Sequence, residues 1–209
     1  MIDPLNVIDY RRSQTELEEF WLFCVMVAGK NADQTARKVE HLLAGRPRRQ
    51  TPLRYLESLG SSLSEALRAC RCGQYGRISR ALVETFPLDL RAAPVEHLQR
   101  VYGVGPKTAR FFVLHTRRDA RVAVLDTHVL KWMRQLGVQE VPQHTPGSLK
   151  QYLRLESLAI GLMEQTFPGM TLAEADLHIW ATVSGRLRLG GTGVSLGPPG
   201  HFSDHASHF

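Results

Sequence analysis

The chain has 209 residues, of which 43% are hydrophobic and 22% charged, which is ample for one substantial domain or two small lobes sharing a cleft. Its net charge of +6 at pH 7 favours a polyanionic partner without establishing one. Three cysteines cannot build a disulfide framework. The longest apolar run (20–29) is too short to span a bilayer, and the N-terminus lacks a signal-peptide pattern. We therefore expect a cytoplasmic protein with free thiols.

Apolar periodicity and turn residues predict a succession of helices. In chain order these lie at 15–29, 32–45, 52–59, 62–71, 75–86, from Pro94, on both sides of a turn within 98–117, from 126, at 148–166 and at 171–184. The first is apolar nearly all round, which marks a buried central helix, and Thr15 with Glu18 resembles a capping box. The only strand-like run, 121–125, is isolated and reads as an extended connection. The predicted fold class is all-α.

Two glycines between helical segments form the most informative pattern in the chain. The pattern Leu98-x-x-Val101-x-Gly103-Val104-Gly105-x-x-x-Ala109 allows the chain to reverse without Cβ clashes, and Pro106 then starts the outgoing helix. The amides of the turn and the positive end of that helix form a ready phosphate site. Candidate nucleic-acid contacts are Gly103, Val104, Gly105 and Thr108. The simpler alternative is an ordinary helical hairpin packed in a core.

Lys107 and Asp126 are the candidate catalytic pair. A lysine amine can act as a nucleophile, although most lysines are merely solvated charges. Asp126 follows the apolar run RVAVL and precedes a helical segment, so it is also a candidate N-cap. The separation, 126 − 107 = 19 residues, allows one helix out and an extended return to the same end. Both groups can therefore face one cleft.

The stretch from Leu98 to Trp132, with GVGPKTA and LDTHVLK, resembles the helix-hairpin-helix (HhH-GPD) DNA glycosylase superfamily, which includes endonuclease III and the 8-oxoguanine glycosylases. The resemblance implies a two-lobed helical fold with a cleft between the lobes, double-stranded DNA as partner and a monomer. It assigns Schiff-base chemistry to Lys107 and the essential carboxylate to Asp126. By the same resemblance, Lys30 or Asn31 is the side chain inserted into the base stack.

Departures from the family pattern refine this expectation. The region after the last helix has no cysteines, so neither an iron–sulfur cluster nor any other metal or cofactor is expected, and the chain resembles the cluster-free branch of 8-oxoguanine glycosylase/AP lyases. Tyr102 stands where a proline is common. The implied location is cytoplasmic and nucleoid-associated or, if the chain is viral, the host cytoplasm.

Four further side chains each have more than one interpretation. His128 either positions Asp126 or contacts phosphate, unless it is an ordinary histidine in a capped helix. Trp132 and Trp180 lie in amphipathic helices and are predicted core residues rather than base-stacking platforms. Asp176 is a candidate second carboxylate of the cleft, although an ordinary acid on a helix surface is the simpler prediction.

Three classes of function remain open on the sequence. The first is a glycosylase that flips a damaged base from duplex DNA, cleaves its N-glycosidic bond and nicks the strand as an AP lyase. The second is a glycosylase-like enzyme that modifies a flipped base, as in viral thymine hypermodification. The third is a non-catalytic hairpin module, which has no need for Lys107 and Asp126 together.

The end of the chain differs in character from the rest. From Gly190 onward it is dense in Gly, Pro, Ser and His and has no periodicity, which predicts a flexible tail. Its histidines match no metal-site spacing that we can defend. The predicted organisation is thus a helical domain at 1–189, with its hairpin motif at 98–117, and a tail at 190–209.

Overall fold

The computed structural model describes residues 2–3 and 7–185, and in this part of the chain every regular element is a helix. The helices are α1 (Gln14–Val27), α2 (Ala32–Leu43), α3 (Pro52–Ser58), the 3₁₀ turn η1 (Gly60–Ser62), α4 (Leu63–Ala69), α5 (Tyr75–Thr85), α6 (Val95–Leu98), α7 (Pro106–Thr116), α8 (Thr127–Gln135), α9 (Leu149–Thr166) and α10 (Leu172–Val183). The all-α prediction is confirmed. The predicted tail at 190–209 lies outside the described residues.

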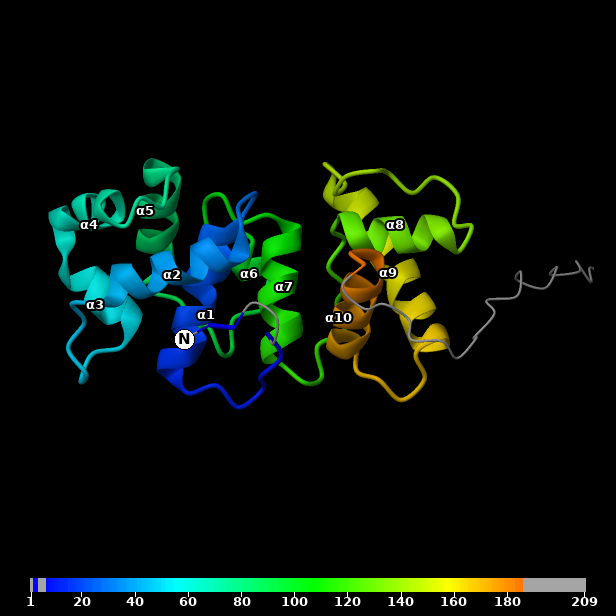
Figure 1. Cartoon of the computed structure of the whole chain (residues 1–209), viewed down its shortest axis with the longest axis horizontal. Coiled ribbons are helices and arrows are strands. Elements are labelled where there is room, and N and C mark those ends of the chain that lie inside the picture. Colours follow the sequence, from blue (N-terminus) through cyan, green and yellow to red (C-terminus); the bar gives the residue numbers. More distant parts are fainter. Residues whose placement is uncertain (1, 4–6, 186–209) are drawn as a thin grey trace, which may run out of the picture.

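The helices form two groups, each with its own hydrophobic core (Figure 1). The first lobe contains α1 to α7, and its core is drawn from residues 7–113. The second lobe contains α8 to α10, with a core drawn from residues 123–179. The chain passes between them once, through a turn at 117–120 followed by an extended segment that ends at 126. No described helix is both long enough and apolar enough to cross a bilayer.

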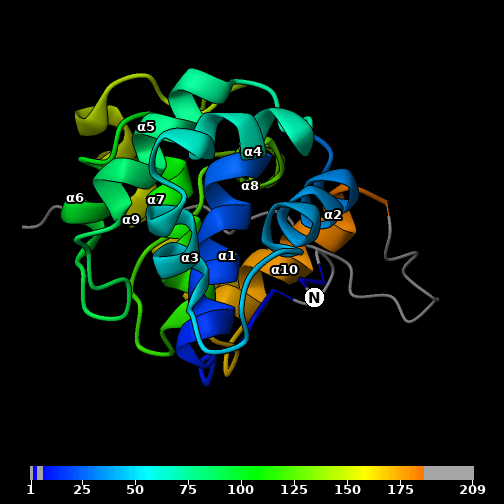
Figure 2. The same ribbon diagram turned by 90° about the vertical axis from the view of Figure 1, so that its left-hand side faces the viewer.

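Helix α1 is the centre of the first lobe, as its apolar sequence predicts (Figure 2). Its residues 20–26 are all buried. The capping box at its start is formed by Ser13 and Glu16, two residues earlier than the predicted pair of Thr15 and Glu18. Glu18 is instead buried, and its carboxylate accepts a hydrogen bond of 2.8 Å from the backbone N–H of Leu53. It thus caps α3 from another helix, because Thr51 makes no side-chain cap there.

We predict that the fully buried hydrogen bond between Trp21 and Thr85 stabilises the first lobe. The indole N–H of Trp21 donates to the Thr85 hydroxyl over 3.1 Å, and this hydroxyl donates to the carbonyl of Ala81. Thr85→Val leaves the indole N–H without a partner, which should lower the free energy of unfolding by about 1–3 kcal/mol. Urea denaturation measures this. Thr116→Val is the matched control, since its hydroxyl makes the same bond one turn back, to Phe112; an equal loss in both variants contradicts the prediction.

Candidate active site

The predicted hairpin joins α6 to α7. Its apolar positions Leu98, Val101, Val104 and Ala109 are buried, with at most 5% of each exposed. Gly103 has a φ of +73°, in the left-handed region that side chains rarely adopt, and a Cβ there would lie 2.7 Å from the Cγ atom of a neighbouring arginine. The reversal therefore depends on this one glycine.

Gly105 has a different function from Gly103. Its φ is −86°, in the extended region, and a Cβ there would meet open space. It is the N-cap residue of α7, and no described side chain caps this helix end. Pro106 has no N–H to offer, so the amides of Lys107 and Thr108 in the first turn have no intrahelical acceptor. They form an open donor site at the positive end of the helix.

Arg77 fixes the hairpin on the body of the first lobe. One guanidinium nitrogen donates to the carbonyl of Gly103 over 3.3 Å, and the other donates to the carbonyl of Val25 in α1 over 2.9 Å. Its methylene carbons occupy the space where a Cβ of Gly103 would lie. Sequence reasoning missed Arg77, because the contact joins residues 26 positions apart.

Asp126 is the N-cap residue of α8. Its Oδ1 accepts hydrogen bonds of 2.9 Å from the backbone N–H groups of both His128 and Val129. Its Oδ2 lies 3.1 Å from Nδ1 of His128. A quarter of the Asp126 side chain remains exposed, so the carboxylate is rigidly held yet accessible. The expected cap is present, and the contact of His128 with the carboxylate agrees with one of its proposed functions, that of positioning Asp126.

A cavity of about 170 Å³ lies where the lobes meet, and Asp126 is part of its wall. Its lining is mostly apolar, from Val7, Phe23, Val27, Ala32, Phe111, Val124, Leu177 and Trp180, with Asp126 and Asp176 as its two carboxylates. Lys107 is exposed and lies four residues before Phe111 on α7, hence on the same face of the helix. Lys107 itself is not part of the cavity lining; its position on α7 is one helical turn from Phe111, which is.

Two residues of α10, Trp180 and Asp176, differ from the simpler prediction made for each of them from the sequence. Trp180 lines the cavity and is only half-buried, its ring 6.3 Å from that of His128, whereas Trp132 is a core residue as predicted and stacks on Phe167. Asp176 is buried, with 7% exposed, which agrees with the second-carboxylate interpretation. The reason is shared: an amphipathic pattern shows which face turns inward but not whether that face meets core or cavity.

Asp176 is paired with a buried histidine. The Nε2 atom of His115 on α7, a fully buried residue, lies 3.5 Å from Oδ2 of Asp176, an ion-pair distance longer than an aligned hydrogen bond. Burial raises the pKa of Asp176, while the proximity of His115 acts in the opposite direction and Asp126 adds to the rise. The two carboxylates of the cavity thus differ: one is capped onto a helix and accessible, and the other is buried.

The turn between α1 and α2 contains the two predicted insertion residues. Val27 and Ala32 on either side of the turn line the cavity, so Lys30 and Asn31 lie close to its rim. The Lys30 amine donates to the carbonyl of Cys72 over 2.7 Å, and burial lowers the pKa of Lys30. Asn31 is exposed and caps α2 by accepting from the N–H of Gln34.

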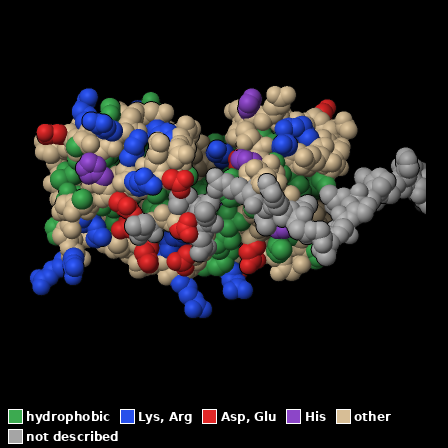
Figure 3. Space-filling view, viewed as in Figure 1, with side chains coloured by type: hydrophobic (Ala, Val, Ile, Leu, Met, Phe, Trp, Pro, Cys, Tyr) green, Lys and Arg blue, Asp and Glu red, His purple; other side chains and the backbone are tan. Residues whose placement is uncertain are grey.

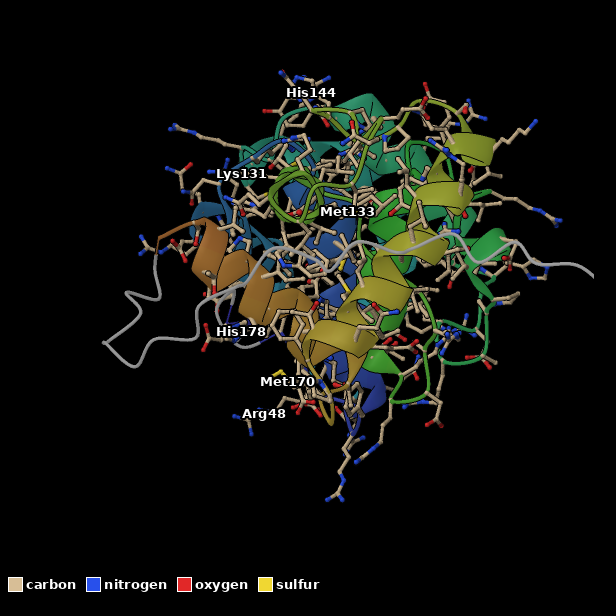
Figure 4. The ribbon with its side chains drawn as sticks, turned by 90° about the vertical axis from the view of Figure 1, so that its right-hand side faces the viewer. Arg48, Lys131, Met133, His144, Met170 and His178 are labelled. Atoms are coloured by element: carbon tan, nitrogen blue, oxygen red, sulfur yellow. The ribbon has the colours of Figure 1, made fainter. Side chains whose placement is uncertain are left out.

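Charge helps to choose between candidate cavities. A larger cavity of about 350 Å³ near the start of α1 is lined by Asp3, Asp9, Glu16 and Glu19 beside Arg12, and this acidic wall disfavours a polyanion. The notch between the lobes, visible at the upper edge in Figure 3, has Lys and Arg side chains on both sides. The exposed basic residue Arg48 lies far from α8, towards the opposite end of the molecule from Lys131 and His144 (Figure 4).

No protein-family model matches the chain. A curated relative, the 8-oxoguanine DNA glycosylase/AP lyase of Thermotoga sp. (strain RQ2), is 35% identical over 86 residues. These residues are 41% of this chain and 39% of the relative, so the match spans about two fifths of the length of each protein.

Two solved structures match almost the whole described fold. The 8-oxoguanine DNA glycosylase of Thermotoga maritima is 26% identical, with a TM-score of 0.61, over 87% of this chain and 86% of that one. The 8-oxoguanine glycosylase/lyase of Methanocaldococcus jannaschii, solved with a 15mer DNA containing 8-oxoguanine, is 20% identical, with a TM-score of 0.61, over 84% of each chain. The resemblance to 8-oxoguanine glycosylases and the helical glycosylase fold predicted from the sequence are confirmed.

We predict that Asp126 stabilises α8 through its cap and not through its charge. Asp126→Asn keeps an oxygen that can accept from the first-turn amides, whereas Asp126→Ala removes it, so only the alanine variant should lose about 1 kcal/mol of stability. Urea denaturation of both variants measures the difference. Equal stability of the two variants would contradict the geometry described for Oδ1.

We also predict that Asp176 costs stability at neutral and higher pH. Because the folded-state pKa of Asp176 lies above that of the unfolded chain, the folded protein binds the proton more tightly, and its stability falls as pH rises through the folded pKa. Asp176→Asn should therefore raise the free energy of unfolding at about pH 8, where histidines are neutral, and not below about pH 4. Asp119→Asn, at an exposed site, is the control for urea melts at both pH values. A gain that is the same at both would refute the prediction.

Proposed function

We propose that this chain is a DNA base-excision enzyme that flips a damaged base from duplex DNA, cleaves its N-glycosidic bond and nicks the strand through a Schiff base. The observation that carries the proposal is a capped carboxylate in the wall of a cavity, Asp126 on α8, beside α7, whose first turn contains the Lys107 amine and an uncapped helix end for phosphate. The named activities of the similar proteins support it.

The open end of α7 and the hairpin turn would bind the DNA backbone. The amides of Gly105, Lys107 and Thr108 can donate to phosphate oxygens, and the helix terminus adds a positive potential. Gly103 and Val104 shape the turn that presents them. The α1–α2 turn at the cavity rim would supply the side chain that fills the gap left by the flipped nucleotide, with Asn31 more accessible than Lys30.

The chemistry follows from the two catalytic side chains. The lone pair of Lys107 Nζ attacks C1′ of the flipped nucleotide, the C1′–N bond breaks, and the base departs with the bonding electrons and takes up a proton. The Asp126 carboxylate stabilises the positive charge that develops on the sugar and accepts the proton lost by the amine. Opening of the sugar ring gives a C1′=N Schiff base, after which loss of a C2′ proton expels the 3′ phosphate.

The walls of the cavity suit an oxidised purine. The aromatic side chains of Phe111 and Trp180 offer stacking surfaces, and Asp176 offers a carboxyl group to the polar edge of a base. The similar proteins are named for 8-oxoguanine, and one was solved with DNA that contains it. We therefore propose 8-oxoguanine as the first base to test.

The test is borohydride trapping on duplex DNA with a single 8-oxoguanine, alongside measurement of released free base. The wild-type protein should give a covalent complex and free base. Lys107→Gln should give no trapped complex, and Asp126→Asn should lower the excision rate by about 10²–10⁴-fold, as expected when a group that handles charge or protons is lost. Lys150→Gln, at an exposed lysine of α9, is the charge-matched control and should match the wild type.

Two results would overturn this proposal. The first is the absence of a trapped complex and of free base across a panel of lesions. The second is a flipped base that stays attached to the sugar and changes mass, which would identify a base-modifying enzyme instead. Full trapping by Lys107→Gln would show that another amine is the nucleophile.

A further inference from the structure

The extended segment that precedes Asp126 is held by side chains instead of by a neighbouring strand. The N–H of Leu125 donates to the hydroxyl of Tyr152 over 3.0 Å, and this hydroxyl donates to the carbonyl of Ala123 over 3.1 Å. The N–H of Ala123 donates to Oε1 of Glu156 over 3.0 Å, and the hydroxyl of Thr145 donates to the carbonyl of Leu125 over 2.8 Å. Tyr152 and Glu156 both belong to α9, so one helix of the second lobe fixes the position and direction of this segment.

The same carboxylate oxygen also binds the first lobe. Nε of Arg110 on α7 donates to Oε1 of Glu156 over 2.7 Å, and both side chains are buried, with 4% and 8% exposed. The guanidinium lies 4.7 Å above the ring of Tyr152, and its other end donates to the side-chain oxygen of Gln99 over 2.8 Å. One oxygen atom of Glu156 therefore joins α7 to the extended segment.

This bond connects the two proposed catalytic residues through a short path. Arg110 lies three residues after Lys107 on α7, and Ala123 lies three residues before Asp126. We propose that Glu156 and Tyr152, together with Arg110, are positioning residues that set the distance between the Lys107 amine and the Asp126 carboxylate across the cleft. The inference rests on the function proposed above.

Stability alone explains this network poorly. A buried ion pair is weak evidence for stability, because its desolvation offsets the attraction, and apolar residues of similar volume often serve as well. Placement, in contrast, needs such directional bonds. A shift of about 1 Å between reacting groups can reduce a rate by about 10²-fold. The network supplies hydrogen bonds to a three-residue segment that ends at the carboxylate.

Two partial reactions distinguish positioning from stability. Release of a base requires both Lys107 and Asp126 at the sugar. Trapping on a preformed abasic site requires chiefly the amine, because the aldehyde is already free to form the Schiff base. Loss of positioning should therefore slow base release far more than trapping. Loss of folded protein would lower both reactions in the same proportion.

The first variant is Tyr152→Phe, which keeps the ring under Arg110 and removes the hydroxyl that binds Ala123 and Leu125. Single-turnover release of 8-oxoguanine should fall by at least about tenfold. Trapping on preformed abasic duplex and the dissociation constant for DNA should change by less than about twofold. A parallel fall in release and trapping would overturn the positioning role.

The second variant tests the link to α7 without leaving a lone buried charge. Arg110→Met combined with Glu156→Gln removes both charges and keeps an oxygen for Ala123, and it should show the same selective loss of base release. The control is Glu164→Gln, which breaks an exposed ion pair between the same extended segment, at Arg121, and α9. It should release base at the wild-type rate; a loss equal to that of the double variant would overturn the proposal.

The experiment separates this inference from the function it rests on. If the wild-type protein releases no base and traps no abasic site, the proposed function is wrong and the positioning role falls with it. If the wild type is active and the double variant keeps the wild-type ratio of release to trapping, the function stands and only the positioning role is wrong.

Discussion

A single carboxylate oxygen, Oε1 of Glu156, links the two lobes through buried hydrogen bonds. It accepts from the Arg110 guanidinium of one lobe and from the Ala123 amide that leads into the other. Extended backbone in a helical protein has no neighbouring strand to form hydrogen bonds with its N–H and C=O groups. Burying such groups without partners raises the free energy of the folded state. The side chains of Tyr152 and Glu156 on α9 provide the hydrogen bonds that a neighbouring strand provides in a sheet. These bonds add to a small hydrophobic cluster between the lobes, formed by Leu114, Val124 and Ala173.

The N-terminal ends of α7 and α8 use the same positive helix dipole in different ways. Both α7 and α8 begin with a positive end of the helix dipole. At α8 the carboxylate of Asp126 occupies that end and accepts hydrogen bonds from the first-turn amides. At α7 the cap residue is Gly105, so the end stays open to an anion from outside. The side chain of the N-cap residue thus decides whether a helix end contains a fixed negative charge, as at Asp126, or can bind an external anion, as at Gly105.

Local patterns in the sequence predicted much of this arrangement. The left-handed Gly103, the α8 cap at Asp126 and the helix bounds each depend on residues a few positions apart, where steric and capping preferences act directly. The capping box of α1 was misplaced because Ser13 with Glu16 and Thr15 with Glu18 match the same pattern. Only the tertiary contact of Glu18 with α3 decides between them.

Features formed by distant residues could not be predicted in the same way. Arg77 reaches the hairpin from α5, and Glu156 reaches Ala123 across 33 positions, so neither leaves a periodic signal. The position of Trp180 shows a second limit. Its helix is amphipathic and its face turns inward, but the inward face of α10 covers both core and cavity. The roles of Lys107 and Asp126 remain proposals that the geometry supports.

The order of the two cores along the chain affects how the protein reaches this fold. Each core is built from one continuous stretch, residues 7–113 and then 123–179, and the chain crosses between them once. The core of the first lobe therefore contains no buried residue from α8, α9 or α10. Most contacts therefore join residues that are near in sequence, which keeps the entropy of loop closure small and favours rapid folding.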